Sequence, residues 1–260
     1  MTKAVLLDID GVLTTSWRPL PGAIEAMAWL KENDVDFRLL TNSSSKTRHG
    51  IALQLDECAM PVDESQILTA VTGAARYLKE RGWQPNCLVL NQGDITEDLE
   101  GLVVSDAGSA DVVLLGGAGP SLGYSDFEAA FRLALQGTPM VALHRNLRYR
   151  TADGLALDMG AFIVGLEAAA GTEIPVVGKP APAFFHAALD QLGREAANVV
   201  VVGDDIEADV FGAQGVGAIG VLVKSGKFHP SDLEGNGGCP DHVIENVGQL
   251  PVLFEEMSWL

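Results

Sequence analysis

The chain has 260 residues, of which 47% are hydrophobic and 20% are charged, a composition typical of globular proteins that excludes disordered and collagen-like chains. Its length allows one large domain or two smaller ones, each with a core of its own. The 17 basic and 35 acidic residues give a net charge of −18, so we expect the protein to bind neither nucleic acid nor anionic membranes.

The first predicted elements alternate between strand and helix. Residues 3–10 form an apolar run that ends in carboxylates, which is typical of a strand buried on both faces of a parallel sheet. A helical pattern covers residues 23 to about 33, and a strand over 36–40 ends at Thr41-Asn42. Ser43–Ser45 can cap a helix over about residues 46–57. This alternation predicts a doubly wound sheet.

The middle of the chain has strands and helices of its own. Strands are predicted over 87–90, 111–115 and 140–143, and helices over about 125–135 and 159–170. Because this section is itself α/β and long enough for a small domain, we interpret residues 83–172 as an inserted α/β cap domain. The core domain then comprises residues 1–82 and 173–260.

The alternation resumes after the predicted cap. Ile174–Val177 is predicted as a strand before Gly178-Lys179-Pro180, and a helix follows over 184–192. The run 198–202 is the most strand-like of the chain and stops at Gly203-Asp204-Asp205. A helix over about 207–214 and a strand over 218–223 follow. The predicted fold class is therefore α/β, with a Rossmann-like, doubly wound parallel sheet in the core.

Cysteine usage and the N-terminal segment indicate the compartment. Cys58, Cys87 and Cys239 are odd in number and widely spaced, which predicts reduced thiols and argues against a disulfide framework or a metal site. The apolar run Ala4–Leu7 is too short for a signal peptide, and no stretch approaches the roughly 18 apolar residues of a membrane span. We therefore expect a soluble, cytoplasmic protein.

Polar residues gather where the predicted strands end. These residues are Asp8, Asp10, Thr41, Asn42, Lys179, Asp204, Asp205 and Asp209. Because ligands of open parallel sheets bind at the carboxyl ends of the strands, we expect these side chains to line one crevice. Clustered carboxylates repel one another unless a cation joins them, and oxygen ligands favour Mg²⁺. Together with a lysine and a hydroxyl, they predict phosphoryl transfer.

The sequence resembles the haloacid dehalogenase superfamily, within the subclass IIA branch whose α/β cap lies between the second and third motifs. The four motifs occur in order as Asp8-x-Asp10-Gly11, Thr41-Asn42, Lys179-Pro180, and Gly203-Asp204 with Asp209. The segments Gly154-Leu-Ala-Leu and Gly160-Ala-Phe also resemble the subgroup that contains phospholysine phosphohistidine inorganic pyrophosphate phosphatases. The resemblance covers nearly the whole chain.

The resemblance implies roles for the residues of the first and last motifs. Asp8 would attack phosphorus and become an aspartyl-phosphate. Asp10 would contact the same phosphoryl group, protonate the leaving oxygen and then activate water. Asp8, Asp204 and the backbone carbonyl of Asp10 would bind Mg²⁺.

The remaining motif residues are expected to hold the phosphoryl group or to support these ligands. Thr41 and Asn42 would donate hydrogen bonds to the phosphoryl oxygens, and Lys179 would neutralise their charge. Asp205 and Asp209 would lie behind the ligands, where they position the metal's waters or Lys179. For Asp205, a role as a helix N-cap is the alternative.

The expected function is that of a Mg²⁺-dependent phosphatase acting on a small phosphorylated compound, which could be a phosphate ester, a P–N compound or pyrophosphate. A phosphotransferase to an acceptor other than water is an alternative. A non-catalytic module that binds Mg²⁺ and phosphate, like a receiver domain, is another, although receiver-like domains lack a large insertion. A scaffold acting through the cap is a third. Caps of this type often pair subunits, so a homodimer through the cap is also expected.

One locally basic patch lies in the predicted cap. It consists of His144-Arg145-Asn146 and Arg148-Tyr149-Arg150. The patch could face the active site and select an anionic substrate, or it could offset nearby acidic residues.

Overall fold

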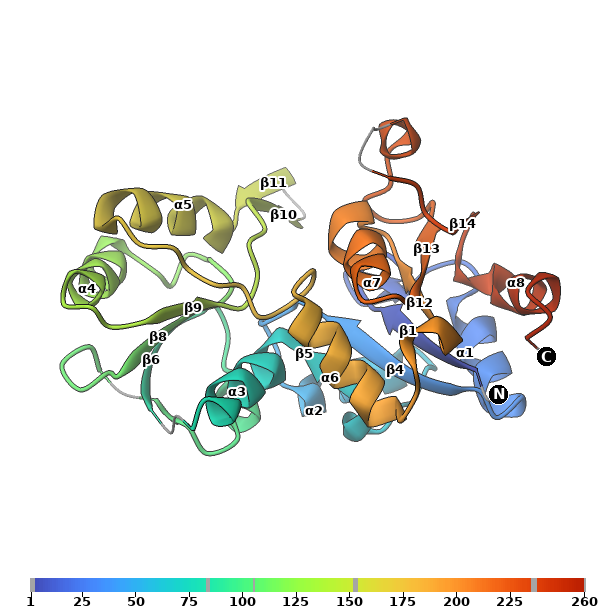
Figure 1. Cartoon of the computed structure of the whole chain (residues 1–260), viewed down its shortest axis with the longest axis horizontal. Helices are drawn as coiled ribbons and strands as arrows, with labels where there is room; N and C mark the ends of the chain where they lie inside the picture. Colours follow the sequence, from blue (N-terminus) through green and yellow to red (C-terminus); the bar gives the residue numbers. More distant parts are fainter. Residues whose placement is uncertain (1–2, 83–84, 105, 152–153, 235–237, 260) are drawn as a thin grey trace. The chain divides into compact units, whose positions relative to one another are not determined.

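A computed structural model describes residues 3–82, 85–104, 106–151, 154–234 and 238–259 (Figure 1). The chain forms two compact units. The first unit comprises Met1–Thr41, Arg48–Leu68 and Lys179–Leu260, and the second comprises Asn42–Thr47 and Thr69–Gly178. The predicted division into a core of 1–82 and 173–260 and a cap of 83–172 stays a prediction, and its boundary residue 83 lies outside the described residues.

Six strands of the described residues form the sheet of the first unit, in the order β14-β13-β12-β1-β4-β5. They are β1 (Ala4–Asp8), β4 (Asp36–Thr41), β5 (Ile67–Thr69), β12 (Val199–Gly203), β13 (Ile219–Val223) and β14 (His242–Ile244). β1 pairs in parallel with β12 and β4, and β13 pairs in parallel with β12 and β14. The strand order reverses between β1 and β12, which is where ligands bind in open α/β sheets.

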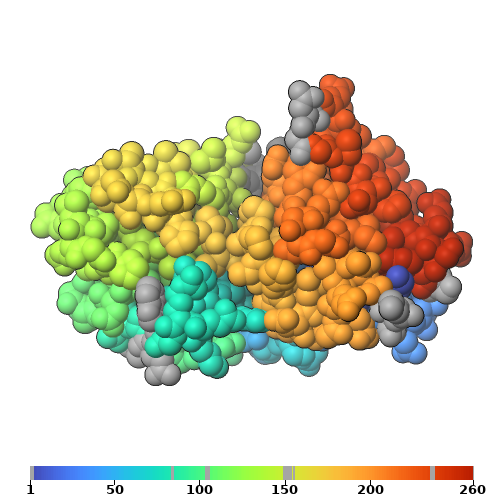
Figure 2. Space-filling model, in the orientation of Figure 1, coloured from blue at the N-terminus to red at the C-terminus, as the bar shows by residue number. Residues whose placement is uncertain are grey.

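Helices cover both faces of this sheet. One face packs against α1 (Ala23–Glu32), α2 (Arg48–Glu57) and α8 (Leu250–Glu256), and the other against α6 (Pro182–Leu192) and α7 (Gly212–Gly215). Val5 and Leu7 of β1 contribute to the first core, whereas Ala4 and Leu6 contribute to the second. In the space-filling view, α6 and α7 form the orange surface over the second face (Figure 2). Burial on both faces explains why the sequence of β1 is continuously apolar.

The second unit has a parallel sheet of its own, in the order β7-β6-β8-β9. Its strands are β6 (Asn86–Leu90), β7 (Val103–Val104), β8 (Val112–Leu115) and β9 (Met140–Ala142). α3 (Ala70–Glu80) packs on one face, and α4 (Tyr124–Leu135) and α5 (Met159–Ala170) pack on the other. Each unit therefore has an apolar core on both faces of its sheet.

The remaining described elements are short hairpins and helical turns. Antiparallel hairpins join β2 (Thr14–Thr15) to β3 (Arg18–Pro19) and β10 (Arg148–Thr151) to β11 (Gly154–Leu157). A π-helical segment, η4, covers Ile206–Phe211. The 3-10 turns are η1 (Glu64–Gln66), η2 (Thr96–Leu99), η3 (Ala196–Asn198), η5 (Pro230–Leu233) and η6 (Val247–Gln249). Among the described helices, none combines the length and apolar character that a membrane crossing requires.

The structure confirms the predicted α/β class and the parallel, doubly wound sheet. β1, β4, β12 and β13 occupy their predicted segments to within two residues at each end. The helix predicted over about 207–214 is instead divided into η4 and α7. The sequence interpretation included neither the β5–α3 connection nor the C-terminal β14 and α8.

The prediction of a strand over Ile174–Val177 is wrong. A single bridge joins Val176 to Ala142 of β9, within the second unit. The N–H of Ala142 donates to the Pro175 carbonyl at 2.9 Å, and the N–H of Val177 donates to the Ala142 carbonyl at 3.0 Å. Pro175 has no N–H to donate, so this segment contributes only an edge contact. Lys179 therefore does not follow a strand of the first sheet.

Candidate active site

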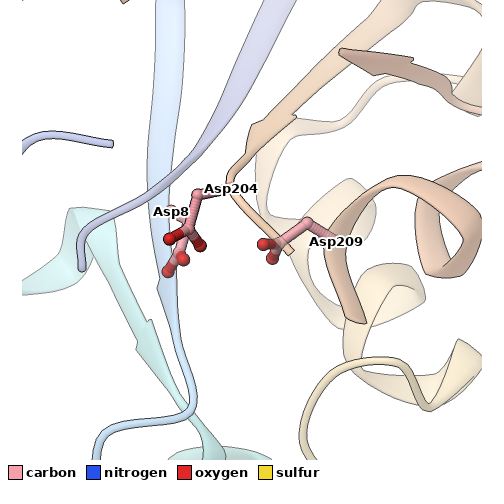
Figure 3. Close-up of side chains that lie close together, drawn as sticks. All are labelled: Asp8, Asp204 and Asp209. Atoms are coloured by element: carbon pink, nitrogen blue, oxygen red, sulfur yellow. The ribbon is translucent and has the colours of Figure 1, made fainter. Parts of the chain in front are cut away.

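Three buried carboxylates meet beyond the ends of β1 and β12 (Figure 3). Asp8 is the last residue of β1, Asp204 directly follows β12, and Asp209 lies within η4. Their exposed fractions are 7%, 2% and 1%. One oxygen from each carboxylate lies within 4.8 Å of the others. The ends of two neighbouring strands and η4 thus bring three carboxyl groups together away from water.

Burial raises the pKa of all three carboxyls. It raises the pKa of Asp204 to about 8, with a further contribution from the charge of Asp8. It raises the pKa of Asp209 to about 6, although the Lys179 ammonium opposes the rise. The pKa of Asp8 is also raised by burial against the opposing charge of Lys179. A cation among these oxygens would stabilise their ionised forms.

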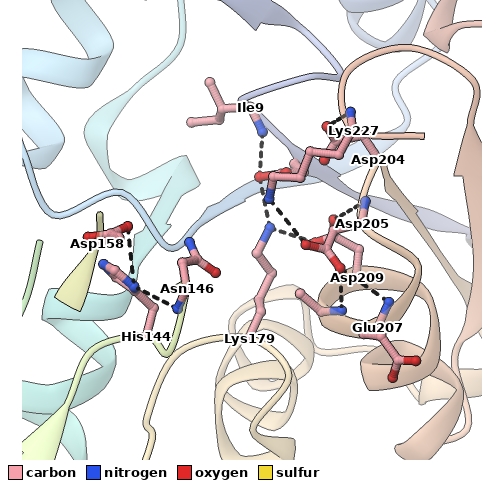
Figure 4. Close-up of polar contacts among 12 residues, drawn as sticks. Ile9, His144, Asn146, Asp158, Lys179, Asp204, Asp205, Glu207, Asp209 and Lys227 are labelled. Atoms are coloured by element: carbon pink, nitrogen blue, oxygen red, sulfur yellow. Dashed lines mark hydrogen bonds and ion pairs between the residues drawn. The ribbon is translucent and has the colours of Figure 1, made fainter. Parts of the chain in front are cut away.

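Lys179 reaches this cluster from the segment before α6 (Figure 4). Its Nζ lies 2.8 Å from Asp8 Oδ1 and 2.6 Å from Asp209 Oδ1, and its side chain is 4% exposed. Burial alone would lower the pKa of this ammonium, but the charges of Asp209 and Asp8 outweigh burial and raise it. Lys179 is therefore held in its charged form beside Asp8.

The chain turns sharply after Asp8. The N–H of Ile9 donates to Asp8 Oδ1 at 2.8 Å, and the N–H of Gly11 donates to the Thr14 carbonyl at 2.7 Å. Gly11 has a φ of 87°, and a Cβ at this position would lie 1.9 Å from Asp204 Oδ2. Glycine is therefore required both for the turn and for the approach of the Asp204 carboxylate.

Asp10 lies at the exposed edge of the same turn. The surrounding protein raises its pKa by partial burial, while the charges of Lys179 and Lys227 oppose the rise. The raised pKa favours the protonated form of the Asp10 carboxyl, which is the form that can donate a proton.

The structure places the second motif at the end of β4. Thr41 is 2% exposed, and its neighbour Leu40 pairs with Asp8 in the sheet. Asn42 belongs to the second unit, where a Cβ added to Gly178 would lie 2.4 Å from Asn42 Oδ1. Contacts of Thr41 and Asn42 with a phosphoryl group stay predictions.

Asp205 caps η4. Its Oδ1 accepts hydrogen bonds from the N–H groups of Glu207 at 3.2 Å and Ala208 at 3.0 Å. Its Oδ2 lies 3.2 Å from Lys227 Nζ. Burial acts to raise the pKa of Asp205, but the Lys227 charge and the Ala208 hydrogen bond outweigh it and lower the pKa. A role for Asp205 toward the metal stays a prediction.

Two residues of the site were missed by sequence reasoning, and both follow β13. The N–H of Lys227 donates to Asp204 Oδ2 at 2.7 Å, and Ser225 Oγ donates to the Gly11 carbonyl at 2.6 Å. The strand predicted over 218–223 ends at the same edge of the sheet as β1 and β12, so the strand-end rule could have found them.

The residues present fit a hard divalent cation. Asp204 Oδ1 is buried and has no hydrogen-bond partner among the residues that the structure describes. The cluster offers only carboxylate oxygens, which suit Mg²⁺ better than soft metals. A Cβ at Gly226 would lie 2.0 Å from Asp204 Oδ2. Gly11 and Gly226, on two different loops, therefore both leave the space that the Asp204 carboxylate occupies.

Two residues of the basic patch, His144 and Arg145, lie beside acidic residues in the structure. Arg145 Nη1 donates to Glu167 Oε1 at 3.0 Å, and Arg145 Nη2 also contacts Glu167. His144 is 4% exposed and lies 4.0 Å from Asp158, which caps α5 (Figure 4). The side chains of Tyr149 and Arg150 lie outside the described residues. These contacts favour the charge-offsetting interpretation for Arg145.

Comparisons with known proteins identify the family of the chain. The haloacid dehalogenase-like hydrolase family matches residues 5–104, and the HAD-hydrolase-like family matches residues 176–250. The chain is 38% identical over 232 residues to haloacid dehalogenase-like hydrolase domain-containing protein 2 of Homo sapiens, covering 89% of this chain and 88% of that protein. The chain belongs to the haloacid dehalogenase-like hydrolase family. It is thus an enzyme of that family, as predicted.

Other members of the haloacid dehalogenase-like family are similar over almost the full chain. Phospholysine phosphohistidine inorganic pyrophosphate phosphatase of Homo sapiens is 33% identical over 253 residues, covering 95% of this chain and 92% of that protein. The solved p-nitrophenyl phosphatase from Archaeoglobus fulgidus superimposes with a TM-score of 0.90 at 28% identity, covering 97% of this chain and 99% of that one. NagD from E. coli K-12 superimposes with a TM-score of 0.85 at 25% identity, covering 96% of this chain and 99% of that one. The predicted resemblance to subclass IIA is confirmed.

Proposed function

We propose that this enzyme is a Mg²⁺-dependent phosphatase that hydrolyses small phosphorylated compounds through an aspartyl-phosphate at Asp8. The observation that carries the proposal is the buried Asp8 carboxylate, which lies 2.8 Å from Lys179 Nζ within a cluster that includes Asp204 and Asp209. Relatives whose names describe phosphatases support the reaction class. The substrate class remains a phosphate ester, a P–N compound or pyrophosphate.

Asp8, Asp204 and the backbone carbonyl of Asp10 would hold the metal, and Asp209 lies close enough to join them or to support Lys179. Bound Mg²⁺ would offset the charge of the carboxylates and of the phosphoryl oxygens as the two approach. The buried Lys179 ammonium adds a positive charge on the other side of Asp8.

In the first step, an Asp8 oxygen attacks phosphorus and the bond from phosphorus to the leaving group breaks. Asp10 gives its proton to the leaving atom. In the second step, water attacks the aspartyl-phosphate, Asp10 takes the proton from water, and the bond between phosphorus and Asp8 breaks to release phosphate and restore the carboxylate. The raised pKa of Asp10 suits the first proton transfer.

The second unit belongs to the proposal as the cap. Its α/β composition and its position in the chain, largely between Thr41 and Lys179, support this assignment. A cap that covers the site would exclude water during the first step and select the substrate. A cytoplasmic location and a homodimer through the cap stay predictions.

The proposal is tested by measuring phosphate release from an aryl phosphate, a phosphoramidate and pyrophosphate, with Mg²⁺ or with EDTA. We expect release that requires Mg²⁺ and is lost in Asp8→Asn. Asp10→Asn should accumulate the aspartyl-phosphate, detected as the mass of one added phosphoryl group on the intact protein. An Asp8→Asn variant with wild-type turnover would refute the nucleophile. If an added alcohol captured most of the phosphoryl group, the phosphotransferase alternative would replace the phosphatase.

A further inference from the structure

The site contains two lysines whose surroundings differ. Lys179 is 4% exposed and contacts Asp8 and Asp209. Lys227 lies on the loop after β13, and its side chain is 58% exposed. Figure 4 shows the two lysines reaching the acidic cluster from different segments of the first unit. Sequence motifs pointed to Lys179 alone, so the role of Lys227 follows from the structure.

Lys227 contacts two carboxylates, Asp204 and Asp205, that are not among the described contacts of Lys179. Its backbone N–H donates to Asp204 Oδ2 at 2.7 Å, and its Nζ donates to Asp205 Oδ2 at 3.2 Å. The charge of Lys227 also opposes the rise that burial causes in the pKa of Asp8 and of Asp10, so the ammonium acts beyond the two carboxylates it contacts.

The balance of charge explains why a second cation is useful. Two ammonium groups, those of Lys179 and Lys227, face a larger set of carboxylates, namely Asp8, Asp10, Asp204, Asp205 and Asp209. A phosphoryl group is itself an anion and is repelled by this excess of negative charge. Any positive charge at the open edge of the site therefore favours the substrate, and the same charge disfavours a divalent cation.

We propose that Lys227 tunes the charge of the site, so that its ammonium strengthens binding of the phosphoryl anion at the expense of affinity for Mg²⁺. The inference rests on the proposed phosphatase function and assigns a residue to the control of its two ligands. A purely structural residue would affect both ligands in the same direction, because a distorted site binds each of them less well. A residue that acts through its charge must shift the two affinities in opposite directions.

Substitution can separate the charge from the backbone contact. Lys227→Met retains most of the apolar stem and the N–H that holds Asp204, but it removes the ammonium. Lys227→Arg retains the positive charge. Lys224→Met is the matched control on the same loop, because Lys224 Nζ pairs with Glu245 Oε1 at 2.6 Å.

The experiment is calorimetric titration of each protein with Mg²⁺ alone and then, at saturating Mg²⁺, with inorganic phosphate. We expect Lys227→Met to bind Mg²⁺ about three- to tenfold more tightly and phosphate weaker by a similar factor. Lys227→Arg and Lys224→Met should match the wild type for both ligands. Because Lys227 is exposed, the differences should shrink in about 1 M salt, where the screening length is about 3 Å.

The outcomes distinguish this inference from the proposed function. Weaker binding of both ligands by a Lys227→Met protein with a wild-type melting temperature would assign Lys227 a positioning role and overturn the inference. Unchanged affinities would overturn it as well. If the wild type bound neither Mg²⁺ nor phosphate, the proposed function itself would fail, and the inference would fail with it.

Discussion

Asp209 Oδ1 lies 2.6 Å from Lys179 Nζ, and both side chains are almost completely buried. The same ammonium lies 2.8 Å from Asp8, so Asp209 holds the lysine that contacts the proposed nucleophile. Asp209 can take this position because Gly203, at the end of β12, has no side chain. A Cβ at Gly203 would lie 2.1 Å from the Asp209 Cβ. The geometry of Lys179 thus depends on η4.

Removal of the Lys179 ammonium should destabilise the protein and abolish activity. Lys179→Met leaves Asp8 and Asp209 buried without their cation, a change that costs about 3–5 kcal/mol in comparable buried pairs. Urea denaturation at neutral pH measures the loss. Lys224→Met, which breaks an exposed pair with Glu245, should cost less than about 1 kcal/mol. Equal losses in the two variants would contradict the assigned burial.

Asp209 and Asp205 should differ in their effect on turnover. Asp209→Asn removes the charge that holds Lys179, and we expect kcat to fall by about 10- to 100-fold, as for other residues that support a catalytic group. Asp205→Asn keeps a side chain that caps helices well, so η4 should persist and kcat should fall less. Steady-state kinetics on an aryl phosphate compares them. A larger loss of kcat in Asp205→Asn would show that turnover depends more on the contact of Asp205 with Lys227 than on that of Asp209 with Lys179.

The raised pKa values predict that the metal-free protein loses stability as pH rises. The pKa of Asp204 is about 8 in the folded state against an ordinary value of 3.8, and that of Asp209 is about 6. Between the ordinary and the raised values, the folded protein holds protons that the unfolded chain has released. The contribution of these groups to stability therefore decreases as pH rises through about 6 and about 8. Thermal melts in EDTA should show a falling Tm over this range.

Mg²⁺ should reverse this loss, because it stabilises ionised carboxylates and competes with protons. The rise in Tm caused by Mg²⁺ should be larger near pH 8 than near pH 6, as judged against the folded-state pKa of Asp204, about 8. Asp204→Asn should show little or no rise at either pH. A Tm increment that is independent of pH in the wild type would argue against binding of Mg²⁺ at these carboxylates.

The approach of Gly226 to Asp204 can be tested with a matched glycine. A Cβ at Gly226 would lie 2.0 Å from Asp204 Oδ2, whereas one at Gly193 would meet nothing within 4 Å. Both residues have positive φ, of 65° and 61°. Gly193→Ala should therefore cost only the strain of a left-handed backbone, about 1–2 kcal/mol.

Gly226→Ala should cost more than Gly193→Ala and should also weaken Mg²⁺ binding, because the Asp204 carboxylate must move. Urea denaturation gives the first quantity and calorimetry the second. If Gly226→Ala matched Gly193→Ala in both stability and affinity for Mg²⁺, the Asp204 carboxylate would not depend on the space at Gly226.

The amino-acid sequence by itself determined the central strands of the parallel sheet and the location of Asp8 and Asp204 at their carboxyl ends. Continuous apolar runs such as Ala4–Leu7 can be buried only between two layers, and this property predicts central strands without reference to the rest of the chain. The carboxylates Asp8 and Asp204 follow two such runs, so their common location at one edge of the sheet follows from strand direction.

Tertiary structure decided which other residues join them. Ile174–Val177 is apolar enough for a strand, but Pro175 and the pairing with β9 leave it at an edge of the second unit. Lys227 reaches Asp204 and Asp205 because β13 lies beside β12. The predicted strand over 218–223 indicates the edge of the sheet at which Lys227 lies, but not which carboxylates it contacts. Local sequence sets periodicity and strand ends, whereas contacts between distant segments depend on sheet order. For that reason the charge balance of the site could be determined only from the folded chain.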